Sequence, residues 1–193
     1  TEADKYALSQ PRLSWTITAI AHTVARQQDT PFLEAQTAWE MARAANSWLR
    51  PRLVKTAVDH AQALFTQLNK PDWVAACIWQ RYTHPWMHDH FPTAVVQLED
   101  ALTTLQQQHC VDFVPSCQLS LALGYVLISE LGKAEAQLAM VENSLAFREN
   151  RLLQGHFLII KSSFLRRQNS ADQLKQTLTQ AFDLFKQVQA PVY

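Results

Sequence analysis

Glycine is scarce in this chain, with three residues among 193, and its scarcity argues against β architectures. Hairpin turns between strands depend on glycine at positions with positive φ. Alanine, leucine and glutamine are plentiful instead, and these residues favour helices. The composition therefore predicts an all-α fold.

An excess of charge of either sign is also missing, because 17 Lys and Arg balance 17 Asp and Glu. Such a chain has no global field to attract nucleic acid or an anionic membrane. No apolar run approaches the roughly 20 residues that a membrane-spanning helix needs. The N-terminal stretch also lacks the basic-then-apolar pattern of a signal peptide. We therefore expect neither a membrane partner nor a nucleic-acid partner.

Cysteine is rare as well, and Cys77, Cys110 and Cys117 match no zinc or redox spacing. Three thiols without a motif favour a reducing compartment, so we expect a cytoplasmic protein. The chain begins at Thr1 rather than at methionine. We expect residues 1–193 to be one helical repeat domain that was cut from a longer protein.

A set of apolar residues recurs every 40 positions along the chain. Four series show this interval: Ala61, Ala101, Val141 and Ala181; Phe65, Leu105, Leu145 and Phe185; Val54, Ala94, Ala134 and Leu174; Val58, Leu98, Leu138 and Leu178. The string A-x3-F-x5-P also occurs twice, at 61–71 and at 181–191. A fixed period of this size predicts stacked helical hairpins, in which small residues let paired helices approach closely and large ones fill the gap to the next repeat.

The period also locates the expected helices. They cover about 13–28, 31–47, 54–69, 73–82, 93–108, 116–131, 133–148, 150–168 and 171–189, which makes about four hairpins after a preceding helix. A tight turn at Leu131–Gly132–Lys133 is expected to absorb a shift caused by the longer linker at 109–115. The least regular connection is expected at 83–92, where histidines and prolines interrupt the pattern.

These residues resemble the tetratricopeptide repeat family. Leu123, Gly124 and Leu127 are similar to its L-G-x2-Y element, and the A-x3-F-x5-P strings to its second helix and the following proline. The period of 40 exceeds the usual 34, as in the long-period arrays of kinesin light chains, of MalT-type transcription regulators and of proteins with CHAT protease domains. The resemblance implies a right-handed α-solenoid whose first helices line a concave groove.

The resemblance further implies that the groove binds a protein, a peptide or another domain of the same chain. Groove residues are expected on the first helices of successive repeats: Trp73, Gln80 and Arg81; Gln118, Tyr125 and Ile128; His156 and Lys161. We expect a scaffold or regulatory module with no cofactor and no catalytic activity of its own.

Two other interpretations remain open. In the first, the module is the ligand-sensing arm of a MalT-type regulator. In the second, the segment with His84, His88, Asp89 and His90 makes it an enzyme, since imidazole and carboxylate groups are ligands for divalent metals. Arg81 and His88 also fit the R-x4-6-H spacing of HEPN ribonucleases, in which these groups assist RNA cleavage. Short spacings of this kind match often, so surface histidines are the simpler explanation.

Overall fold

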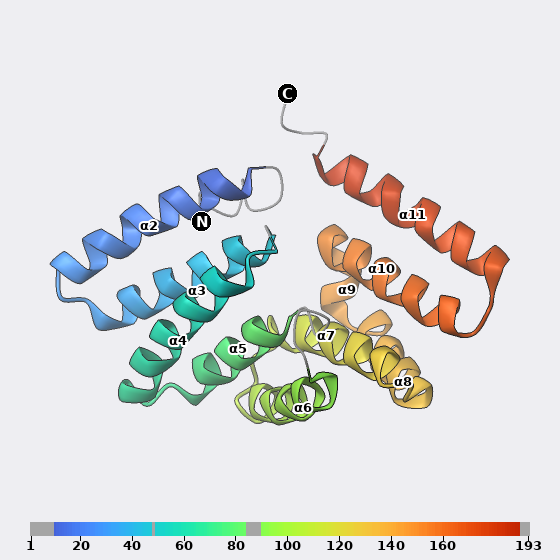
Figure 1. Cartoon of the computed structure of the whole chain (residues 1–193), viewed down its shortest axis with the longest axis horizontal. Coiled ribbons are helices and arrows are strands. Elements are labelled where there is room, and N and C mark those ends of the chain that lie inside the picture. The colour runs from blue at the N-terminus through green and yellow to red at the C-terminus, as the bar shows by residue number, and fades with distance from the viewer. Residues whose placement is uncertain (1–9, 48, 84–89, 190–193) are drawn as a thin grey trace. The chain divides into compact units, whose positions relative to one another are not determined.

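The computed structural model describes residues 10–47, 49–83 and 90–189 of the chain. Of these residues, 85% are helical and none lies in a strand, which confirms the all-α fold. Ten helices follow one another in this part of the chain (Figure 1). None of the helices in the described ranges combines the length and the apolar character that crossing a membrane requires. By its internal contacts the chain divides into two compact units.

In its described residues, unit 1 (Thr1–Met87) contains four helices, and each packs on the next along the chain. They are α2 (Pro11–Gln27), α3 (Pro31–Ser47), α4 (Pro51–Gln67) and α5 (Pro71–Tyr82). The first residue of each of these helices is a proline, and successive prolines are 20 residues apart. Proline suits this place because the first N–H of a helix has no intrahelical partner and its φ is already helical. Helix α5 also contacts α3, so successive hairpins stack through their first helices.

Unit 2 (His88–Tyr193) contains the remaining helices, which again pack mainly on their neighbours in sequence. They are α6 (Phe91–Gln107), α7 (Val114–Leu127), α8 (Leu131–Glu142), the short α9 (Leu145–Glu149), α10 (Arg151–Arg167) and α11 (Ala171–Gln189). Helix α10 packs against α7 as well as α11. Because α7 contacts α6, α8 and α10, it is buried on nearly every side.

Most turns between these helices have one backbone geometry, and it recurs at intervals of 20 residues or a multiple of 20. The residue with positive φ is, in the described part of the chain, Asp29, Leu49, Asn69, His109, Ser129 or Asn169. In the first of these turns, Thr30 N–H donates to the Ala25 carbonyl and Asp29 N–H donates to the Arg26 carbonyl. This pair of bonds satisfies carbonyls at the helix end that would otherwise lack partners. Each 40-residue repeat is therefore two helix-and-turn units of about equal length.

The small residues of the 40-residue period lie in the core, as predicted. Ala61, Ala101, Val141 and Ala181 are each at most 1% exposed. The larger residues follow the prediction only in part. Phe65 and Leu105 are fully buried, whereas Leu145 is 67% exposed.

The exposure of Leu145 has a local cause, because the single helix predicted for 133–148 is wrong. Helix α8 ends at Glu142, and α9 starts at Leu145 after Ser144, whose hydroxyl accepts a hydrogen bond from Phe147 N–H. This break takes Leu145 out of the helical register. The predicted turn at 131–133 is also wrong, since the turn lies at 128–130 and Gly132 is helical.

Candidate functional site

The groove residues predicted in unit 1 belong to a packed aromatic cluster and an ion pair. Trp73 stacks on Phe65 with ring centroids 4.9 Å apart, and its edge meets Trp39 at 5.7 Å. Arg81 donates a hydrogen bond from Nη2 to Asp59 Oδ1 at 2.5 Å and another to Gln62 Oε1 at 3.0 Å. The side chain of Gln80 is only 2% exposed. Packing alone thus accounts for Gln80.

The groove residues predicted on α7 of unit 2 are also largely buried. Gln118 is 5% exposed, and its side-chain amide donates to Met140 Sδ at 3.4 Å. Tyr125 is 5% exposed and donates its hydroxyl proton to Glu99 Oε1 at 2.5 Å. Burial, this hydrogen bond and the nearby carboxylates raise the pKa of Tyr125 above its usual range. Ile128, at the end of α7, is half-buried.

The two groove residues predicted on α10 are more exposed to solvent than Gln118 and Tyr125 on α7. His156 is exposed, with its ring centroid 5.9 Å from that of Phe185. Lys161 is half-buried, lies 3.7 Å from a Glu142 carboxylate oxygen and covers the ring of Phe157. These two residues are accessible to a partner, unlike Gln80, Gln118 and Tyr125.

The predicted metal and ribonuclease residues lie mostly outside the described residues. This applies to His84, His88 and Asp89, while His90 is exposed at the start of α6. The guanidinium of Arg81 is engaged by Asp59 and Gln62.

The thiols offer little nucleophilic chemistry in the part of the chain that the structure describes. Burial raises the pKa of both Cys77 and Cys117 to about 12, so neither forms the reactive thiolate at neutral pH. Cys110 is only partly exposed, in the turn that follows α6.

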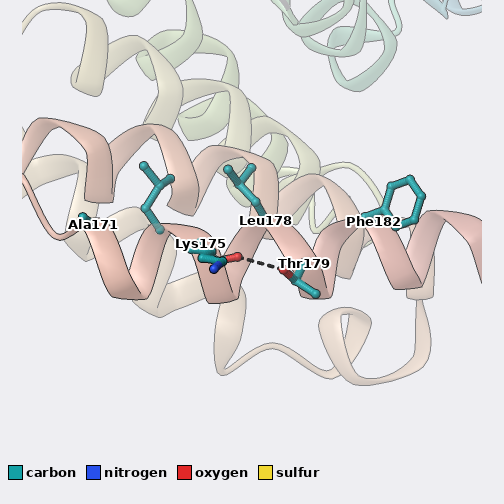
Figure 2. A pocket seen from close by; sticks show the side chains of 6 residues that line it. Ala171, Lys175, Leu178, Thr179 and Phe182 are labelled. Atoms are coloured by element: carbon teal, nitrogen blue, oxygen red, sulfur yellow. Dashed lines mark hydrogen bonds between the residues drawn. The ribbon is translucent and has the colours of Figure 1, made fainter.

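Unit 2 carries an exposed apolar stripe on α11, where the sequence predicts packed residues at Leu174 and Leu178. We call it the α11 face; it is hollowed and is lined by Ala171, Leu174, Lys175, Leu178, Thr179 and Phe182. Figure 2 shows these side chains along the helix, with the Thr179 hydroxyl donating a hydrogen bond to the Lys175 backbone carbonyl. Leu178 is 44% and Phe182 69% exposed, although a helical spacing of four residues is typical of a buried stripe.

The 40-residue period explains why this exposure is unusual. The residues that correspond to Leu178 in earlier repeats, Val58, Leu98 and Leu138, are at most 6% exposed. Helices α4 and α6, which carry Val58 and Leu98, pack against the helix that follows them in sequence. A helix that packed on the α11 face would cover α11 as α5 covers α4 and α7 covers α6.

No protein-family model matches the chain, and neither a curated protein nor a solved structure matches it. The resemblance to tetratricopeptide repeats therefore stays a prediction.

Proposed function

We propose that this chain is a protein-interaction module that binds an amphipathic helix of a partner protein on the α11 face. The observation that carries the proposal is the exposure of Leu178, at a position that is buried in the earlier repeats, together with the exposure of Phe182 one turn further along α11. Exposed apolar stripes of this kind are a common feature of interaction surfaces.

The chemistry of the partner follows from the packing inside the chain. Helix α5 packs on α4 and α7 packs on α6, so a helix fits α11 better than an extended peptide does. A partner helix would place apolar residues at i, i+3, i+4 and i+7 against Leu174, Leu178 and Phe182. An acidic residue beside this stripe would face Lys175, which is one of the residues that line the hollow.

We propose that this surface belongs to a tetratricopeptide-like right-handed solenoid, which has a scaffold or regulatory role and no catalytic activity of its own. The sequential packing of helical hairpins in each unit supports this architecture. Trp73 and Arg81 of unit 1 remain candidates for a further contact with a partner, and so, within unit 2, do Ile128, His156 and Lys161.

A displayed library of amphipathic helical peptides tests the α11 face directly. Peptides selected on the wild-type chain should lose binding to the double variant Leu178→Lys, Phe182→Lys. Both side chains are exposed, so the fold should survive, which circular dichroism can check. Burying one such apolar side chain contributes roughly 1.5–3 kcal/mol, so the two together should weaken binding by at least about 100-fold.

The matched control is Val111→Lys, which places the same charge at an apolar residue that is 72% exposed on the linker before α7. Peptides should bind this variant as they bind the wild type. Selected peptides that bind equally well to the double variant would place the interaction elsewhere. Failure to select any helical peptide would also count against the proposal.

A further inference from the structure

Three side chains with metal-ligating chemistry converge in unit 1 from three different helices. They are His22 on α2, Glu34 in the first turn of α3 and His60 on α4. One ligand atom from each lies within 4.8 Å of the other two. We propose that His22, Glu34 and His60 bind a divalent transition-metal ion, with Zn²⁺ as the ion that suits them best. This site is independent of the α11 face, which lies in unit 2.

His22 already makes the kind of hydrogen bond that metal-binding histidines commonly make. Its Nδ1 lies 3.2 Å from the Glu34 backbone carbonyl and 3.1 Å from the Thr37 hydroxyl. A carbonyl oxygen only accepts, so Nδ1 must carry the proton, and Nε2 on the other side of the ring holds a lone pair. The Thr37 hydroxyl agrees with this assignment, because it donates its own proton to the carbonyls of Leu33 and Glu34. Metal-binding histidines commonly donate their second ring N–H to a carbonyl in this way.

In the proposed site, the ion binds between His60 and Glu34, which already contact each other. Nε2 of His60 lies 2.8 Å from Glu34 Oε1, and the carboxylate accepts the proton that Nε2 carries. Around a tetrahedral zinc ion with bonds of about 2.0–2.1 Å, neighbouring ligand atoms are about 3.3 Å apart. The ion takes the place of the shared proton, which leaves for solvent or for Nδ1 of the same ring. The two side chains then move apart by about half an ångström.

The donor set and its exposure favour zinc over the harder cations. Two imidazoles and one carboxylate form a ligand set typical of zinc sites with an open position, whereas Mg²⁺ prefers oxygen ligands alone. The side chain of Glu34 is 17% exposed and that of His60 is 43% exposed, so an ion can reach the cluster from solvent. Water can then occupy the fourth position.

One neighbouring charge opposes the binding of a cation. Nε of Arg26 lies 3.6 Å from the same carboxylate oxygen of Glu34. The side chain of Arg26 is 66% exposed, so it can swing into solvent when the ion binds. Arg26 should therefore reduce the affinity without preventing binding.

Calorimetric titration with ZnCl₂ on the full chain tests the site. Wild-type protein should bind one equivalent that is absent from His60→Ala and from Glu34→Gln, with an affinity loss of more than about tenfold. Zinc at about 100 times its dissociation constant should also raise the melting temperature by about 5–10 °C, and MgCl₂ should not. Because His60 is exposed, its alanine variant should keep the wild-type circular dichroism spectrum.

Two further variants make the result decisive. The triple variant His84→Ala, His88→Ala, His90→Ala removes the histidine segment that the sequence suggests as a metal site, and it should keep the equivalent that His60→Ala loses. Arg26→Gln should bind zinc severalfold more tightly, since it removes the competing charge. The proposal is overturned if wild-type protein binds no zinc, or if the triple variant loses the equivalent while His60→Ala retains it.

Discussion

Two glycines that lie inside helices differ in what a side chain would meet. A Cβ atom added at Gly155 on α10 would lie 2.9 Å from Cζ of Phe185 on α11, a distance at which the ring must shift. A Cβ at Gly132 on α8 would meet nothing within 4 Å. Helices α10 and α11 can therefore approach closely at Phe185 because Gly155 has no side chain.

Paired alanine substitutions at these glycines should have opposite effects on stability. Gly132→Ala should stabilise the protein by up to about 1 kcal/mol, the cost of glycine in the middle of a helix, because Gly132 lies in the first turn of α8. Gly155→Ala gains the same helix propensity but displaces the Phe185 ring, and crowding of this kind costs about 1–3 kcal/mol. Thermal unfolding should therefore place Gly155→Ala below Gly132→Ala.

A Phe185→Leu background tests whether crowding of the Phe185 ring is what destabilises Gly155→Ala. In a Phe185→Leu background, Gly155→Ala should cost less than it does in the wild type, because the smaller side chain leaves room for the new methyl group. An equal cost in both backgrounds would show that Phe185 is not the obstacle.

At the residue scale, the small residues of the period follow the prediction, whereas a contact particular to one helix cannot be predicted from the period. The alanines of the period are buried as expected because close helix pairing recurs in every repeat. The position of Gln118 and Tyr125 on a first helix predicts that they line the groove. In the structure, α7 is enclosed by α6, α8 and α10, which leaves those side chains inside. Only the packing of the particular helices reveals this.

At the scale of the element, the recurring turn places residues other than glycine in the left-handed region. That region costs an ordinary residue roughly 1–2 kcal/mol, and asparagine tolerates it better than leucine does. Leu49 and Asn69 occupy equivalent turns, after α3 and α4, with φ of 54° and 52°. The turn after α3 is therefore the more strained of the two.

Glycine substitutions should reveal this difference between the turns. Leu49→Gly should stabilise the protein by about 0.5–1 kcal/mol, since relief of the left-handed cost exceeds the entropy that glycine loses. Asn69→Gly should be nearly neutral. Gln67→Gly, in the last turn of α4, should destabilise by up to about 1 kcal/mol. If Leu49→Gly and Asn69→Gly changed the denaturation midpoint equally in urea, the strain at Leu49 would be absent.

The helix boundaries were predictable to the extent that local residues mark them. Proline opens α2, α3, α4 and α5 at intervals of 20 residues, so their starts are visible in the sequence. The break between α8 and α9 was missed because the apolar period runs through it. The capping hydroxyl of Ser144 was the available signal, since serine is a favoured residue just before a helix.

At the scale of the whole molecule, neither candidate site was predictable from a motif. His22, Glu34 and His60 lie on three helices and share no short spacing, so only the packing of α2, α3 and α4 brings them together. Leu174 and Leu178 of the α11 face hold the positions that Val54 and Val58 hold on α4, where both valines are buried. The exposure of the α11 face depends on which helices lie beside it, which the pattern of α11 itself does not contain.

The division into two units makes a prediction about how the molecule unfolds. All six tryptophans lie within residues 1–87, so tryptophan fluorescence reports on unit 1, while the circular dichroism of helices reports on both units. Phe65 and Leu105 hold equivalent positions of the repeat in units 1 and 2, and both are fully buried. Replacing either by alanine should cost several kcal/mol, about 3–5 for phenylalanine and 2–5 for leucine.

Because helical arrays are stabilised mainly by contacts between neighbouring repeats, each loss should remain largely local. Phe65→Ala should lower the midpoint seen by fluorescence. Leu105→Ala should lower the midpoint seen by circular dichroism and move the fluorescence midpoint much less. Urea titrations followed by both signals on each variant make the comparison. If Leu105→Ala shifted the two midpoints equally, the loss in unit 2 would be shared by unit 1, and the chain would unfold as one cooperative body.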